Sequence, residues 1–205
     1  MHPKNIITAG KLPSESEKAI ILLHGRGGSA EDMTFIAGRL QIDDFAVLIP
    51  RANRNTWYPY SFLMPEERNQ PWLDGALDLL SGLEAELQEE GIPSSSIYFA
   101  GFSQGACLSL EYTARNAKKY GGVIAFTGGL IGDKIHEDKY RGDFQGTKIF
   151  IGSGDPDSHI PVKRVRETEL LLKKLNARTS VYIYPEIGHT IIKEELDTVN
   201  RLFFS

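Results

Sequence analysis

Short, almost continuously apolar runs recur along the chain, and each of them predicts a strand. The runs cover residues 19–23, 45–49, 97–100, 123–126, 148–151 and 181–184. Their apolar residues follow one another instead of alternating with polar ones, which is typical of strands in a parallel sheet that is covered on both faces. The pattern therefore predicts a mostly parallel sheet of about six or seven strands with helices on either side.

Segments with helical spacing lie between these runs. Ser29 is expected to cap the first helix, because Asp32 follows three residues later and can complete a capping box. Apolar stripes with helical spacing are present at residues 33–40, 73–87, 106–117, 162–175 and 192–203. The second of these helices is expected to stop at Gly91, with Pro93 behind it.

This alternation of strands and helices predicts a single α/β domain over residues 1–205. No insertion is large enough to form a cap domain. In such a sheet the strands are joined by crossovers, and ligands bind outside their carboxyl ends. The loops that follow the strands are therefore where candidate chemistry is expected.

Composition and charge narrow the possible partners. The net charge is −4 and the basic residues are scattered, which argues against nucleic acid as a partner. The short basic cluster at residues 163–166 is expected to be a solvated helix surface. The N-terminal residues lack the apolar stretch of a signal peptide, and no apolar run approaches 18 residues. We therefore expect a cytoplasmic protein without stable membrane association. The single cysteine, Cys107, is expected in the core.

The run at 97–100 leads directly into Gly101-Phe-Ser103-Gln-Gly105, and a predicted helix follows at once. This is the G-x-S-x-G nucleophile elbow in its strand, turn and helix setting. Glycines two residues on either side of the serine let neighbouring backbone approach without a Cβ clash. The pattern predicts that Ser103 is a catalytic nucleophile.

A serine hydroxyl needs a base, and with this elbow the chain order is serine, acid, histidine. His2 lies at the terminus and His24 precedes the serine, while His136 lies in a charged surface stretch and His159 within the expected acid loop. His189, directly after the last predicted strand, is therefore the expected base.

The acid is expected in the loop after residues 148–151, because that loop lies between the serine and the base. Asp155 and Asp157 both stand there. The acid must hold the imidazole in the tautomer whose free nitrogen faces the serine. Spacing alone does not choose between the two aspartates.

Free backbone N–H groups are expected where the first long strand ends in Leu-His-Gly-Arg-Gly-Gly, at residues 23–28. In this arrangement one oxyanion donor is the N–H of Gln104, and the other comes from this early loop, for which Arg26 is the best candidate. A phosphate-binding loop is disfavoured, because neither G-K-[ST] nor G-x-G-x-x-G spacing is present.

Taken together, four ordered motifs resemble the phospholipase/carboxylesterase family of small α/β hydrolases, which includes acyl-protein thioesterases. The motifs are residues 23–28, 101–105, Gly154-x-x-Asp157-x-x-x-Pro161 and Gly188-His189. The resemblance implies the α/β-hydrolase fold, selects Asp157 as the acid, and supports Arg26 and Gln104 as oxyanion donors. It makes His24 a structural residue. Arg26 stands where thioesterases of the family often have an apolar residue; its side chain would attract a substrate carboxylate or point into solvent.

Substrate contacts are expected from the long aromatic connection at residues 53–71, which could act as a partial lid. The candidates are Trp57, Tyr58 and Phe62, together with Leu130 and Ile160. The alternative is that these side chains cover the sheet edge or form the contact of a homodimer.

The predicted function is hydrolysis of a carboxylic ester by Ser103, His189 and Asp157 through an acyl-enzyme, as in a carboxylesterase, lysophospholipase or thioesterase. No metal or organic cofactor is expected, and the substrate is a small ester or thioester. The alternatives are a lactone hydrolase of the dienelactone type, an acyltransferase, or a hydrolase fold that binds a small ligand without turning it over.

Overall fold

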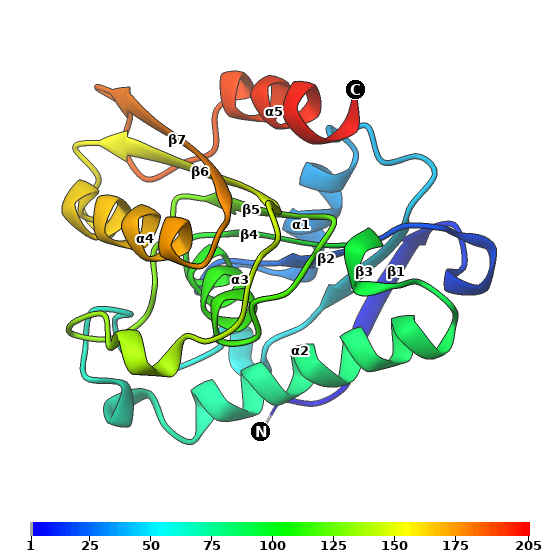
Figure 1. Cartoon of the computed structure of the whole chain (residues 1–205), viewed down its shortest axis with the longest axis horizontal. Coiled ribbons are helices and arrows are strands. Elements are labelled where there is room, and N and C mark those ends of the chain that lie inside the picture. The colour runs from blue at the N-terminus through cyan, green and yellow to red at the C-terminus, as the bar shows by residue number, and fades with distance from the viewer. Residues whose placement is uncertain (1) are drawn as a thin grey trace.

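The computed structural model describes residues 2–205, which form one seven-stranded sheet with helices on both faces (Figure 1). The strands are β1 (Ile6–Gly10), β2 (Ala19–Leu23), β3 (Ala46–Pro50), β4 (Ile97–Phe102), β5 (Gly122–Phe126), β6 (Lys148–Asp155) and β7 (Arg178–Pro185). Their order across the sheet is β1-β3-β2-β4-β5-β6-β7, and β1 alone is antiparallel to its neighbour.

Two helical layers cover the sheet. The helices are α1 (Ala30–Ala37), α2 (Trp72–Glu89), α3 (Gln104–Arg115), α4 (Val162–Lys174) and α5 (Lys193–Val199), with a π-helical turn at Asn200–Phe204. Residues of α1 and α5 share one apolar cluster with the sheet, whereas those of α2, α3 and α4 share the cluster on the opposite face (Figure 1). Within residues 2–205, no helix combines the length and the apolar character needed to cross a membrane.

The apolar runs form strands because both of their faces are buried. In β2, Ile21 and Leu23 pack on the side of α2 to α4, while Ile20 and Leu22 pack on the side of α1 and α5. All four are fully buried. Each side chain of this kind stabilises the fold by about 1.5–3 kcal/mol relative to its exposed state. This two-sided burial explains why the run shows no alternation.

The six predicted strands and the mostly parallel sheet are confirmed. The seventh strand, β1, has no counterpart among the predictions. It is an edge strand in which only Ile6, Ile7 and Ala9 are apolar before Gly10, and none of its residues is fully buried. The sixth strand also runs on to Asp155, through residues that were expected to form a loop.

The order in which successive strands are added reverses in the middle of the sheet, at β2, although β2, β3 and β4 all run parallel. β2 is followed by β3 on one side, whereas the next strand, β4, pairs with β2 on the other side. At such a switch point the loops after the two strands diverge and leave a crevice at the carboxyl edge. The loop after β2 and the turn after β4 therefore meet at the place where a ligand is expected.

Candidate active site

Ser103 occupies a strained turn between β4 and α3. Its backbone has φ 54° and ψ −116°, a conformation that costs a non-glycine residue on the order of 1–3 kcal/mol. The flanking glycines make the turn possible, because a Cβ atom on Gly101 would lie 2.4 Å from the carbonyl carbon of Gly105. A Cβ atom on Gly105 would in turn lie 2.2 Å from the carbonyl oxygen of Leu23. The turn directs the hydroxyl of Ser103 into a pocket.

A continuous hydrogen-bonded chain links three side chains from three loops. His189 Nε2 lies 2.7 Å from Ser103 Oγ, although the two residues are 86 positions apart. On the other side of the ring, His189 Nδ1 lies 2.8 Å from Asp157 Oδ2. With Nδ1 protonated toward the carboxylate, Nε2 is free to accept the proton of the serine hydroxyl. The structure thus brings together the three residues that the sequence nominated.

The carboxyl of Asp157 is held as an anion. Its Oδ1 accepts hydrogen bonds from the backbone N–H groups of His159 and Ile160, at 2.7 and 2.9 Å. Burial by itself would raise the pKa of this carboxyl, but the two N–H donors and His189 outweigh burial and place its pKa below the usual value. The competing Asp155 ends β6 and is exposed. The geometry therefore pairs His189 with Asp157.

The loops that carry the acid and the base touch through their backbones. A Cβ atom on Gly154 would lie 2.1 Å from the carbonyl oxygen of Ile187 and 2.6 Å from that of Gly188. Glycine at residue 154 thus lets the end of β6 approach the loop that follows β7. This contact explains why a glycine stands three residues before Asp157.

Arg26 and Gln104 line the same pocket from different elements. Gln104 is the first residue of α3, and Arg26 lies in the loop that follows β2. Within residues 2–205, neither backbone N–H donates a hydrogen bond to another protein atom. Unpaired donors of this kind are suited to hold a negatively charged oxygen.

The pocket around Ser103 has a volume of about 530 Å³. Tyr58, Phe62 and Ile160 line it, as expected from the sequence. The sequence interpretation missed the wall residues Phe102, Cys107 and His159. The first stands directly beside the serine in the chain, and the third lies in the acid loop, so proximity to those motifs was the available signal.

Trp57 is not a lining residue of this pocket, which corrects the sequence interpretation. It is fully buried, and its indole Nε1 donates to the carbonyl oxygen of His24 at 2.9 Å. The ring packs against the imidazole of His24 with centroids 5.0 Å apart. Trp57 therefore stabilises the loop after β2 through its contacts with His24.

Leu130 is also absent from the pocket lining. It is fully buried, and its carbonyl oxygen accepts a hydrogen bond from Arg164 Nη1 at 2.9 Å. The same guanidinium donates to the carbonyls of Gly132 and Asp133. Arg164, expected as a solvated surface residue, is thus buried on α4 and fixes the 130–133 loop.

Two other histidines, His24 and His2, form hydrogen bonds with backbone groups. His24 is buried, and its Nε2 accepts a hydrogen bond from the N–H of Ala52 at 3.1 Å. Burial lowers its pKa, so it stays neutral and remains an acceptor. His2, near the N-terminus, is held by two hydrogen bonds: its Nδ1 accepts from the N–H of Asn53, and its Nε2 bonds the carbonyl of Trp57. Neither ring belongs to the serine site.

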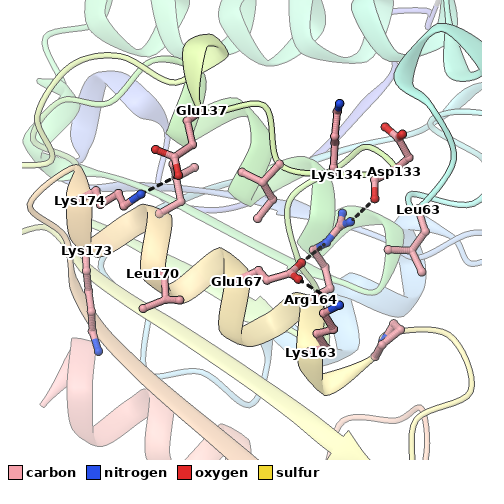
Figure 2. A pocket seen from close by; sticks show the side chains of 13 residues that line it. Leu63, Asp133, Lys134, Glu137, Lys163, Arg164, Glu167, Leu170, Lys173 and Lys174 are labelled. Carbon is pink, nitrogen blue, oxygen red and sulfur yellow. Dashed lines mark hydrogen bonds and ion pairs between the residues drawn. The ribbon is translucent and has the colours of Figure 1, made fainter.

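A second cavity, of about 880 Å³, lies between α4 and the 133–137 loop and contains none of the three hydrogen-bonded residues. Figure 2 shows a mixed-charge lining, in which Lys174 points to Glu137 and Arg164 lies between Asp133 and Glu167. Its basic groups are largely neutralised by their own partners. The hydrogen-bonded serine, histidine and aspartate belong to the smaller pocket and its rim.

Cys107 is confirmed as buried, and burial raises the pKa of its thiol to about 12. The thiol is therefore protonated at neutral pH and is a poor nucleophile. No group of three or more His, Cys, Asp and Glu side chains that could hold a metal ion is present in residues 2–205. Ser103 is the nucleophile candidate that has a base within hydrogen-bond distance.

The sheet, its switch point and the serine elbow define an α/β hydrolase. The sequence matches the model of the phospholipase/carboxylesterase family over residues 4–203. The chain therefore belongs to the phospholipase/carboxylesterase family, and it is a carboxylic ester hydrolase.

Known relatives agree with this assignment. The crystal structure of a phospholipase/carboxylesterase from Dyadobacter fermentans is 50% identical, covers 100% of this chain and 98% of its own, and superposes with a TM-score of 0.98. Acyl-protein thioesterase 1 of Neurospora crassa is 28% identical over 88% of this chain and 83% of its own length. Lysophospholipase-like protein 1 of Mus musculus is 25% identical over 87% of this chain and 82% of its own length.

Proposed function

We propose that the protein hydrolyses carboxylic esters by nucleophilic catalysis at Ser103. The observation that carries the proposal is the hydrogen-bonded chain from Ser103 Oγ through His189 to Asp157. His189 Nε2 removes the hydroxyl proton as Ser103 Oγ attacks the ester carbonyl. The anionic Asp157 stabilises the imidazolium that forms and keeps Nε2 directed at the serine.

The negative charge that develops on the carbonyl oxygen is held by the backbone N–H groups of Arg26 and Gln104. Support comes from the absence of a protein partner for either donor in the described chain. His189 then gives its proton to the leaving alcohol, which departs and leaves an acyl group on Ser103. A water molecule, deprotonated by His189, attacks this ester and releases the carboxylic acid, so that the enzyme returns to its starting state.

Tyr58, Phe62 and Ile160 are proposed to contact the acyl or alcohol part of the substrate. They are the apolar members of the pocket wall that the sequence nominated. The pocket volume of about 530 Å³ is within the usual range for small-molecule sites. Relatives are named as an acyl-protein thioesterase, a lysophospholipase-like protein and a carboxylesterase. The cytoplasmic location, the absence of a cofactor and a homodimer stay predictions.

The experiment is a rate comparison on p-nitrophenyl acetate, butyrate and octanoate, a palmitoyl thioester and a lactone, with the wild-type chain and Ser103→Ala. We expect wild-type turnover of at least one oxygen ester and a loss of about 10⁴-fold or more in the variant. The rank order then separates an esterase from a thioesterase or a lactonase. An inactive wild type on every substrate, or equal rates for the two proteins, would overturn the proposal.

A further inference from the structure

The two proposed oxyanion donors belong to separate elements, and one segment of the chain is fastened to both. This bridging segment comprises residues 55–60, which follow β3 and form part of the pocket wall. It meets the loop after β2 on one side and the first turn of α3 on the other. The side chains that make these connections are those of Arg26 and Gln104 themselves.

Gln104 binds the bridging segment through its side-chain amide. Its Oε1 accepts a hydrogen bond from the N–H of Trp57 at 2.8 Å, and its Nε2 donates to the carbonyl of Tyr58 at 2.8 Å. The amide is buried, with only 5% of the residue exposed. Both bonds are therefore shielded from competition with water. They fix the start of α3 to the segment.

Arg26 binds the other end of the same segment. Its guanidinium donates to the carbonyl of Pro59 at 2.6 Å and to the carbonyl of Tyr60. The charged group also lies 5.9 Å from the ring centroid of Tyr58. Arg26 is exposed, but its guanidinium is hydrogen-bonded to the pocket wall and does not extend freely into solvent. The two bonds use both terminal nitrogens of the planar guanidinium, as in other forked contacts of arginine.

Two further bonds attach the segment to the loop after β2. The N–H of Gly27 donates to the carbonyl of Asn55 at 2.7 Å, and the indole of Trp57 donates to the carbonyl of His24 at 2.9 Å. The backbone N–H of Arg26 lies between these two attachment points in the chain. Its direction depends on how firmly the loop is held, because the loop belongs to neither a helix nor a strand.

We propose that the guanidinium of Arg26 is a positioning group, which sets the direction of its own backbone N–H relative to that of Gln104 by clamping the bridging segment. The inference rests on the proposed function of the two N–H groups. Electrostatic stabilisation of a transition state requires donors that are already in place, and small displacements are costly. Replacing the Arg26 side chain leaves its backbone N–H present but releases the clamp.

The test compares Arg26→Met and Arg26→Lys with the wild type on the best p-nitrophenyl ester. Arg54→Met is the matched control, because Arg54 is an exposed arginine of the same connection, and its side chain makes no hydrogen bond or ion pair within the described chain. Inhibition by phenylboronic acid is measured in parallel, since its tetrahedral serine adduct places an oxygen in the oxyanion hole.

We expect kcat of Arg26→Met to fall about tenfold with KM changed by less than about threefold, and the boronate inhibition constant to rise about tenfold. Arg26→Lys keeps one carbonyl contact, so its kcat and its boronate inhibition constant should lie between those of the wild type and Arg26→Met. Arg54→Met should match the wild type. Thermal unfolding of all variants verifies that the fold is intact.

Two results would overturn the inference. One is an Arg26→Met enzyme with wild-type kcat and wild-type boronate affinity. The other is a rise in KM with kcat unchanged, which would mean that the clamp only shapes the pocket wall. Both results require that the wild type is active and that Ser103→Ala abolishes this activity. They can therefore be distinguished from failure of the proposed function itself.

Discussion

Gly105 lies so close to Leu23 that a Cβ atom on the glycine would be 2.2 Å from the leucine carbonyl oxygen. The first turn of α3 therefore packs directly on the end of β2. This contact brings the N–H of Gln104 beside the loop that carries Arg26.

Gly105→Ala should damage both stability and catalysis. The new methyl group would clash with backbone atoms of Leu23, which cannot move aside as a flexible side chain could. We therefore expect a loss of about 2 kcal/mol in the free energy of unfolding, measured by urea denaturation. The turnover number should fall as well, because the turn that carries Ser103 must shift. Gly82→Ala on the exposed face of α2 meets no atom within 4 Å, and this control should gain up to about 1 kcal/mol. Equal stabilities for the two variants would contradict the packing argument.

Replacing each of the two candidate acids, Asp157 and Asp155, should show which of them acts in catalysis. Asp157→Asn removes the charge that stabilises the imidazolium, and its amide favours the wrong tautomer of His189. We expect kcat to fall about 10³-fold or more. Asp155→Asn changes an exposed residue at the end of β6 and should stay within about twofold of the wild type. Steady-state rates on one ester decide between them; a larger loss in Asp155→Asn would reassign the acid.

A buried carboxyl should make the stability of the fold depend on pH. Glu195 is 1% exposed; its Oε2 accepts from the N–H of Ile192 at 3.0 Å, and its Oε1 has no partner in the described chain. Burial raises its pKa to about 7. Between the ordinary value and pH 7 the folded protein keeps a proton that the unfolded chain has lost, so stability falls as pH rises through this range. The full loss, on the order of 3 kcal/mol, is reached above pH 7.

The measurement is urea denaturation of Glu195→Gln at several values between pH 4.5 and pH 8. The variant should unfold at the same urea concentration as the wild type at pH 4.5 and at a higher one at pH 8. The exposed neighbour in Glu194→Gln is the matched control and should follow the wild-type curve. Parallel curves for wild type and Glu195→Gln would show that the carboxyl is not the cause.

Most of the sheet was predictable, because a strand covered on both faces must be apolar at nearly every position, as β2 and β5 are. β1 was not, since an edge strand with one neighbour needs few buried residues and Ile6–Gly10 offers only a short, mixed pattern. The end of β6 was missed for a different reason. Its Gly-Ser-Gly residues are typical of a loop, yet here they belong to the strand, and Gly154 lets the strand approach the loop of His189.

The members of the candidate site were predictable because each stands beside a motif with a fixed place in the fold. Spacing left Asp155 and Asp157 as alternatives, and the hydrogen bond to His189 distinguishes them. Trp57 and Leu130 were misplaced, since an aromatic or apolar side chain suits a pocket wall and a core equally well. The direction of a side chain depends on neighbours distant in the sequence, such as His24 for Trp57 and Arg164 for Leu130.

The measurement that tests the central claim most directly is covalent labelling with a fluorophosphonate, followed by mass spectrometry of the peptides. We expect one label for each chain, attached to Ser103, with loss of ester hydrolysis in proportion to the labelled fraction. His189→Ala should react far more slowly, because the hydroxyl has lost its base. Full hydrolytic activity in the completely labelled protein, or stoichiometric labelling at another residue, would contradict the account.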